Sequence, residues 1–209
     1  MNPRALFEEG LDVLAARDSD LASVIAAHGR PEFWSREPGF SALVLIILEQ
    51  QVSLASAKAA FNRMVEDVGV PTPESFLRLD AETLRSMGFS RQKARYCRIL
   101  AEEVSSGKLD LDAVGGMTDD AARSTLMQVT GIGRWTADIY LLCALSRPDV
   151  WPVGDLALVG AIQQVKGLDR RPSPVEFESL GEQWRPWRSV AAQILWHHYL
   201  GVRKLKVKR

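Results

Sequence analysis

Hydrophobic residues recur along most of this chain at intervals of three or four positions, the spacing that places them on one face of an α-helix. Strand-like alternation is scarce, and residue types that begin and end helices stand between the apolar runs. Residues 40–50 are apolar on nearly every side, which is typical of a helix buried all round. The pattern predicts an all-α protein with about ten helices. We expect helix starts at Asp18, Ser53, Thr72, Asp80, Ser90 and Thr118.

Charge and cysteine content narrow the class of protein. The 26 basic and 26 acidic side chains cancel, so net charge neither suggests nor excludes a polyanionic partner. Cys97 and Cys143 lie among apolar neighbours, which predicts buried, reduced thiols and excludes a four-cysteine metal or iron–sulfur site built from this chain. The N-terminus lacks the apolar core of a signal peptide, and the longest apolar run is too short to cross a bilayer. We therefore expect a cytoplasmic protein without a membrane partner.

The stretch "VTGIGRWTAD", residues 129–138, places two glycines between predicted helices. Gly131 and Gly133 allow a sharp turn that exposes main-chain N–H groups, and the following helix adds the positive end of its dipole. Such an arrangement binds anions, and phosphate is the natural occupant, with Arg134 placed to assist. A helix C-cap followed by an N-cap explains the same two glycines, so the motif alone leaves both interpretations open.

Further motifs extend this pattern. "VTGIGRWTAD" resembles the helix–hairpin–helix of base-excision DNA glycosylases, and "WPVGDLAL" (151–158) resembles the Gly/Pro stretch ending in aspartate that accompanies it. "LEQQVSLASAKAA" (48–60), "GFSRQKARYCRILA" (88–101) and "WRPWRSVAAQILW" (184–196) complete a likeness to the 3-methyladenine DNA glycosylase II family, the AlkA type of the HhH-GPD superfamily. The resemblance covers roughly residues 40–199.

The resemblance implies a single HhH-GPD unit over residues 1–209, with two helical lobes and an active-site cleft between them. It places the helix–hairpin–helix at about 119–145 and includes no N-terminal β domain. Residues 202–209 are read as a basic, solvated tail, with contact to DNA phosphates as the alternative interpretation.

The family's catalytic aspartate corresponds to Asp155. An aspartate before a helix is otherwise simply an N-cap, and the two roles are compatible. The carboxylate would stabilise positive charge on the sugar and orient or deprotonate the attacking water. Bifunctional relatives carry a lysine nucleophile where this chain has Trp135, so the resemblance implies a monofunctional enzyme that leaves an abasic site.

The resemblance also assigns DNA-contacting residues. The base pocket corresponds to Trp135, Trp196, Ile139 and Leu156; the last two stand where some relatives carry tyrosine, which makes this pocket more apolar. The wedge that fills the gap left by the flipped base corresponds to Gln51, although an ordinary polar helix end explains "QQ" equally well. The phosphate-binding hairpin corresponds to Gly131, Gly133, Arg134 and Thr136, and the remaining tryptophans are interpreted as core: Trp34, Trp151, Trp184 and Trp187.

No cofactor is expected beyond a structural Na⁺ or K⁺, which the resemblance places on the main-chain carbonyls of Met127, Val129 and Ile132. No spacing typical of a divalent metal site occurs around the histidines. The expected partner is double-stranded DNA containing damaged bases, bound by a monomer. Two alternatives remain: a glycosylase for oxidised or mismatched bases, and a non-enzymatic helix–hairpin–helix binding module. The basic residues that are read either as a solvated face or as phosphate contacts are Arg91, Lys93, Arg95, Arg98, Arg185 and Arg188.

Overall fold

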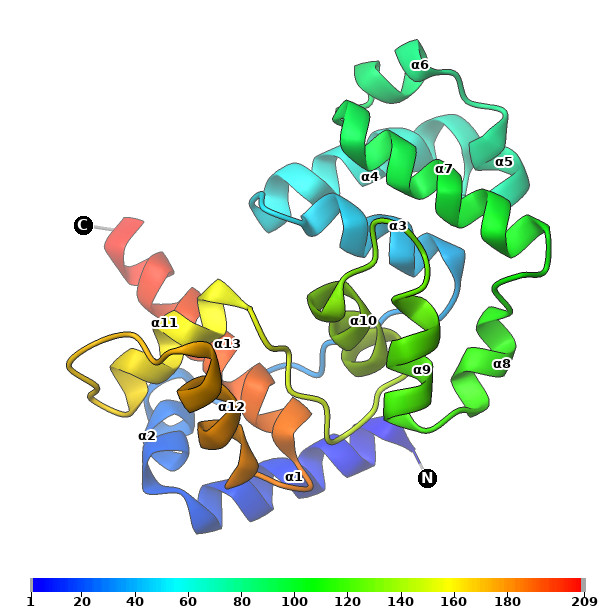
Figure 1. Ribbon diagram of the computed structural model, residues 1–209. Coiled ribbons are helices and arrows are strands. Elements are labelled where there is room, and N and C mark those ends of the chain that lie inside the picture. The colour runs from blue at the N-terminus through cyan, green and yellow to red at the C-terminus, as the bar shows by residue number, and fades with distance from the viewer. Residues whose placement is uncertain (1, 208–209) are drawn as a thin grey trace. The chain divides into compact units, whose positions relative to one another are not determined.

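The computed structural model describes residues 2–207, with side chains as far as Val202. Every regular element in this range is a helix, which confirms the all-α prediction. The chain divides into two compact units, which are drawn in Figure 1. Unit 1 combines the residues up to Ser35 with those from Ser146 onward, and unit 2 is the continuous stretch Arg36–Leu145.

Unit 1 is built around its last helix. Helices α1, α2 and α11 all pack against α13, and leucines of α1 and α2 share the interior with Ile194 and Leu195. The interior is closed by Trp184, whose indole N–H donates to Asp18 at 2.8 Å. The helices are α1 (Pro3–Arg17), α2 (Ser19–His28), α11 (Leu156–Val165), α12 (Pro174–Glu182) and α13 (Arg188–Val207).

Unit 2 is built around the apolar helix α3. Helices α4, α7 and α10 and the π-helix η1 pack against it, which is why α3 carries no polar face. Leu43, Val44, Ile46 and Ile47 are fully buried. The helices are α3 (Phe40–Glu49), α4 (Leu54–Val68), α5 (Pro73–Leu77), α6 (Ala81–Ser86), α7 (Arg91–Ser105), α8 (Leu111–Gly116), α9 (Asp119–Leu126), α10 (Arg134–Ile139) and η1 (Tyr140–Ala144).

The six expected helix starts are confirmed, because each of those side chains accepts a hydrogen bond from a main-chain N–H of the turn that follows. The number of helices is wrong, since the described residues contain more than ten. Helix α8 was not expected, because six residues ending in two glycines carry almost no periodic pattern.

Two further differences concern helix ends. The helix expected through residues 134–145 changes to π geometry at Tyr140. The basic segment expected to lie outside the helices continues α13 to Val207, because lysine, arginine and leucine favour helix and no proline ends it; residues 208–209 lie outside the described range.

The buried thiols are confirmed. Cys97 and Cys143 are both buried and unpaired, and burial raises the pKa of Cys143 to about 12. Burial also raises the pKa of Cys97. Within residues 2–207, none of the helices combines the length and apolar character needed to cross a membrane.

Candidate functional site

The glycine turn of unit 2 joins α9 to α10 and uses its two glycines differently. Gly131 has φ +100, and a Cβ added there would lie 2.6 Å from the Cβ of Tyr96 on α7. Both the backbone angle and the packing therefore require glycine. Gly133 is the N-cap of α10 in extended conformation, with no side-chain cap and open space around it. The first N–H groups of the helical run 134–144 thus receive no side-chain acceptor from the N-cap residue.

A buried carboxylate ties the two hairpin helices together. Asp138 on α10 is fully buried, and Arg123 on α9 donates to it from Nε at 2.6 Å. The Nε of Arg134 lies 3.7 Å from the same carboxylate, while about half of the Arg134 side chain stays exposed. Arg134 therefore stands at the start of α10, near an internal countercharge and open to solvent.

Thr136 is turned inward. Thr136 is only 2% exposed, and its hydroxyl accepts a hydrogen bond from Gln50 Nε2 at 2.9 Å. A phosphate contact through this hydroxyl is therefore not supported, because the group already serves the interior of unit 2. The expected contact at Thr136 remains only as one through its main-chain N–H.

The residues at the end of α3 present an exposed tip. Gln51 has φ +58, a backbone region that non-glycine residues seldom adopt, and its side chain is exposed. Val52 and Leu54, which follow it, are also exposed apolar residues. An exposed tip of this composition suits insertion between stacked bases.

In unit 1, Asp155 is the N-cap of α11. Its Oδ1 accepts a hydrogen bond from the Leu158 N–H at 2.9 Å, and its own N–H donates to Pro152 O at 3.3 Å across the turn that contains Gly154. Asp155 is 8% exposed, whereas the next residue, Leu156, is 76% exposed. The carboxylate is thus fixed at the positive end of a ten-residue helix.

Trp196 has an aromatic partner that the sequence did not reveal. Its ring stacks on that of Trp34, with centroids 5.4 Å apart and planes 10° apart. The main-chain N–H of Trp34 donates to Oε1 of the buried Gln193, one turn before Trp196, at 2.9 Å. Trp34 is only half-buried, so its interpretation as core was wrong. Periodicity could not have found this pair, because Trp34 lies in a loop.

The other tryptophans follow expectation more closely. Trp151 and Trp184 are buried, and Trp151 stacks on Phe177, which confirms them as core. Trp187 packs against Gly10 of α1 but, like Trp34, is only half-buried, so it is not the buried core residue that was expected. Trp135, on α10, is half-buried, and the nearby Ile139 is buried.

The expected site residues therefore fall into two groups. Unit 2 holds the exposed tip, the hairpin, Trp135 and Ile139. Unit 1 holds Asp155, Leu156 and Trp196.

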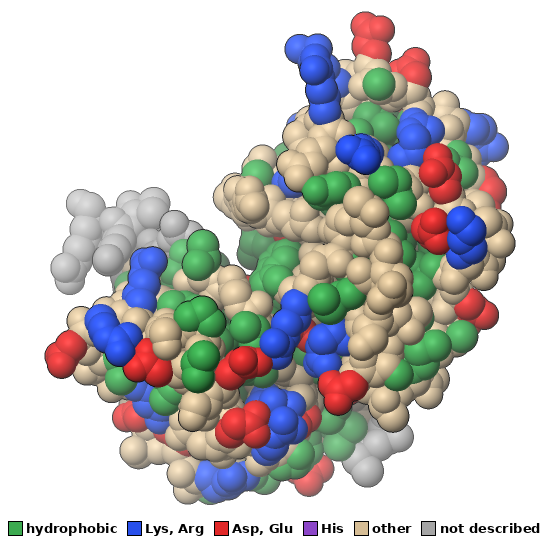
Figure 2. All heavy atoms as spheres, viewed as in Figure 1, with side chains coloured by type: hydrophobic (Ala, Val, Ile, Leu, Met, Phe, Trp, Pro, Cys, Tyr) green, Lys and Arg blue, Asp and Glu red, His purple; other side chains and the backbone are tan. Residues whose placement is uncertain are grey.

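The sequence did not decide whether its basic residues contact phosphates or form a solvated face, and two of them bind main-chain carbonyls of the protein instead. Lys93 donates from Nζ to Leu48 O at 2.6 Å at the end of α3. Arg98 donates to the carbonyl of Leu77, the last residue of α5, and to that of Leu79 just after it. Arg91 and Arg95 stay exposed on the same helix. In Figure 2, basic and acidic side chains are interspersed on the visible face, without a large patch of one sign.

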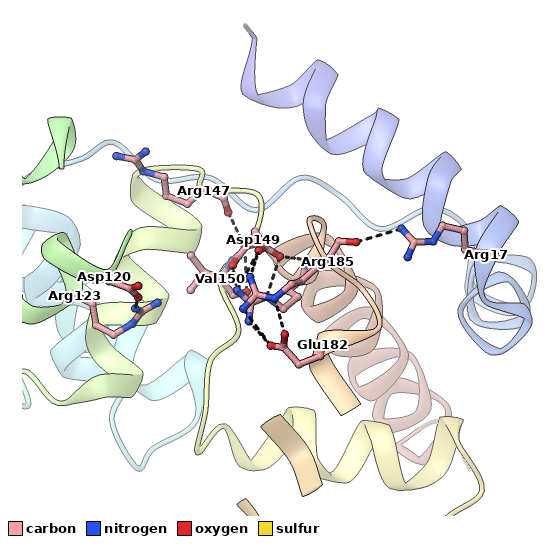
Figure 3. Close-up of polar contacts among 10 residues, drawn as sticks. Arg17, Asp120, Arg123, Arg147, Asp149, Val150, Glu182 and Arg185 are labelled. Carbon is pink, nitrogen blue, oxygen red and sulfur yellow. Dashed lines mark hydrogen bonds and ion pairs between the residues drawn. The ribbon is translucent and has the colours of Figure 1, made fainter. Parts of the chain in front are cut away.

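Arg185 lies beside the carboxylates of Asp149 and Glu182 in Figure 3, and Arg188 forms ion pairs with the same two residues of unit 1. Arg188 donates from Nε to Asp149 at 2.9 Å, and Arg185 donates from NH1 to Asp149 at 2.7 Å. Both also reach Glu182. These two arginines are therefore held by acidic neighbours within the protein.

The carbonyls expected to hold a monovalent cation lie in the hairpin turn. Val129 O accepts a hydrogen bond from the Ile132 N–H at 3.0 Å. Within the described range, no hydrogen bond reaches the carbonyl oxygens of Met127 and Ile132. Main-chain carbonyl oxygens are neutral ligands that suit a hard monovalent cation such as Na⁺ or K⁺. The same range contains no group of three or more His, Cys, Asp or Glu side chains arranged to hold a metal ion.

Comparison with known proteins shows which family has this sequence and fold. Residues 44–186 match the family model of the HhH-GPD superfamily base excision DNA repair protein. The chain is 30% identical over 165 residues to the putative DNA-3-methyladenine glycosylase YfjP of Bacillus subtilis, a match that covers 75% of this chain and 58% of that relative. It is 31% identical to DNA-3-methyladenine glycosylase 1 of Schizosaccharomyces pombe, over 77% of this chain and 72% of the relative.

Solved structures agree with the sequence relatives. The 3-methyladenine DNA glycosylase of Schizosaccharomyces pombe in complex with abasic DNA superposes with a TM-score of 0.83 at 27% identity, over 90% of this chain and 95% of that chain. The chain therefore belongs to the HhH-GPD superfamily of base excision DNA repair proteins, within its DNA-3-methyladenine glycosylase family.

Proposed function

We propose that this protein is a monofunctional DNA glycosylase that hydrolyses the N-glycosidic bond of alkylated bases in duplex DNA, with 3-methyladenine-type lesions as substrates. The observation that carries the proposal is Asp155, a family-matched carboxylate fixed by the Leu158 N–H at the N-terminus of α11. In this proposal the protein acts as a monomer in the cytoplasm and leaves an abasic site in the DNA strand.

The chemistry needs a single carboxylate. When the bond between the sugar C1′ and the base nitrogen breaks, its electron pair leaves with the base and positive charge develops on the sugar. The Asp155 carboxylate stabilises that charge and accepts a proton from the water that attacks C1′. A base alkylated on a ring nitrogen is already cationic and leaves as a neutral molecule, so no general acid has to protonate it.

Trp135 supports the monofunctional assignment. Cleaving the strand as well requires an amine that attacks C1′ and forms a Schiff base. An indole has no such nucleophile, and the stretch "GRWTADIYLL" contains no lysine.

The other assignments complete the substrate complex. A base cannot be reached while stacked, so it is rotated out of the duplex and its place is taken by the exposed tip at Gln51. The flipped base is received by four residues, Trp135, Trp196, Ile139 and Leu156. The indole faces of the two tryptophans attract a cationic ring. The main-chain N–H groups after Gly133, together with Arg134, bind a phosphate of the strand.

A Na⁺ or K⁺ at the hairpin is part of the proposal. The carbonyl oxygens of Met127, Val129 and Ile132 would hold it, and two of these receive no hydrogen bond in the described structure. The ion would fix the turn and add positive charge beside the bound phosphate. It takes no part in breaking the glycosidic bond.

The test is base release from DNA of defined damage. The protein is incubated with duplexes that each contain one lesion, including 3-methyladenine, 7-methylguanine, hypoxanthine and an etheno adduct, and the free base is measured. We expect release of alkylated bases, an intact strand, and loss of release in Asp155→Asn. Binding without release from any lesion would instead indicate a non-enzymatic damage-recognition module.

A further inference from the structure

Gln50 is a half-buried residue at the end of α3 whose side chain reaches the hairpin from a distant part of the sequence. Its Nε2 donates to Gly131 O at 3.0 Å and to Thr136 Oγ1 at 2.9 Å. One amide group therefore contacts both the glycine turn and the first turn of α10.

The end of α3 is also held from another side. Lys93 Nζ donates to Leu48 O at 2.6 Å, and the Gln50 N–H donates to Ile47 O at 3.3 Å. The chain thus leaves α3 at a point fixed by α7 and by the hairpin. The next residue is Gln51, exposed and in the left-handed region. A residue held in this conformation depends on its surroundings to keep it there.

We propose that Gln50 is a positioning residue that fixes the exposed tip at Gln51 relative to the phosphate-binding hairpin. This inference rests on the proposed function, in which Gln51 enters the base stack while the hairpin grips a phosphate. The two contacts fall on one DNA duplex, so the spacing between the two protein segments determines whether both form together. Gln50 sets that spacing through two hydrogen bonds from one atom.

Binding to DNA that contains a stable abasic-site analogue measures this positioning without any chemical step. The readout is the preference, the dissociation constant for undamaged duplex divided by that for the abasic-site duplex. Gln50→Met keeps the length of the side chain and removes both hydrogen bonds. We expect it to lower the preference about fivefold to tenfold, a coupling typical of residues in direct contact. Gln183→Met is the matched control, because it also loses a side-chain bond to a carbonyl, Leu180 O, in unit 1.

A double variant separates positioning from a general loss of stability. If Gln50 acts through Gln51, then Gln50→Met adds no further loss of preference in a Gln51→Ala background. Additive losses would overturn the inference, and so would wild-type preference in Gln50→Met whatever its melting temperature. If Gln50→Met does not fold, Thr136→Val removes only one acceptor and should lower the preference by a smaller factor; an unchanged preference there also overturns it.

The same binding measurement keeps the two proposals distinct. A wild-type protein that prefers abasic-site DNA but releases no base refutes the proposed glycosylase activity and still decides the role of Gln50. A wild-type protein with no preference for abasic-site DNA overturns the role of Gln50, because there is then no discrimination for it to set.

Discussion

The Oδ1 of Asp155 accepts a hydrogen bond from the Leu158 N–H at 2.9 Å, so the proposed catalytic carboxylate is also the cap of α11. Asparagine caps helices as well as aspartate does but carries no charge. Asp155→Asn should therefore lower single-turnover base release by about 10²-fold or more and leave stability almost unchanged. Asp155→Ala should lose both activity and about 1 kcal/mol of unfolding free energy. Urea denaturation and base release measure the two effects, and equal stabilities of the Asn and Ala variants would contradict the capping role.

The two hairpin glycines should respond differently to alanine. Gly131→Ala places a Cβ against Tyr96 and requires alanine at φ +100, so we expect a loss of about 1–3 kcal/mol in unfolding free energy. Gly133 has an ordinary backbone angle and open space around it, so Gly133→Ala should cost less than about 1 kcal/mol. Urea denaturation of both variants checks this, and similar losses at the two positions would refute it.

The stacked pair of Trp34 and Trp196 should affect which bases are released. The parallel indole of Trp34 covers one face of Trp196, which is only 6% exposed, and fixes the orientation of its ring. Under the proposed function this ring contacts the cationic base, so its orientation affects binding of that base. Trp34→Leu should lower kcat/KM for a cationic base such as 7-methylguanine about threefold to tenfold. It should change kcat/KM for neutral hypoxanthine less, and Trp34→Phe should restore part of the loss. A uniform loss for both bases in Trp34→Leu would indicate a role in folding alone.

Stability should fall as the pH drops below 6.5. Burial, followed by the nearby charge of His28, lowers the pKa of His198 below its ordinary 6.5, and His198 Nδ1 has no hydrogen-bond partner among the described residues. Below pH 6.5 the unfolded chain is protonated at His198 more readily than the folded protein. The contribution of His198 to the free energy of unfolding is therefore complete above pH 6.5 and declines below it. Urea denaturation at pH 7.5 and 5.5 measures the decline. His198→Gln should have a smaller decline, and an equal one would exclude this histidine as the cause.

Local features of the sequence were enough to predict the helix starts, because each cap bonds a main-chain N–H of the turn that follows. The glycines and Asp155 were found by motif, since their roles depend on a short stretch of backbone. Contacts between distant segments were not predictable in this way. The bond from Gln50 to Gly131 joins residues 81 positions apart, and the bond from Gln50 to the inward-facing Thr136 hydroxyl joins residues 86 positions apart. The bonds from Arg185 and Arg188 to Asp149, 36 and 39 positions away, were hidden for the same reason.

The composition of unit 1 from both ends of the chain has a consequence for how the protein folds during synthesis. Helices α1 and α2 leave the ribosome before any part of unit 2. Helix α13, against which they pack, leaves only after the whole of unit 2. Unit 2 is continuous, so it completes its set of helices while the buried faces of α1 and α2 still lack their partner. Those two helices therefore spend the longest time with apolar surface open to solvent, and they are the segment of the nascent chain that most needs protection by chaperones.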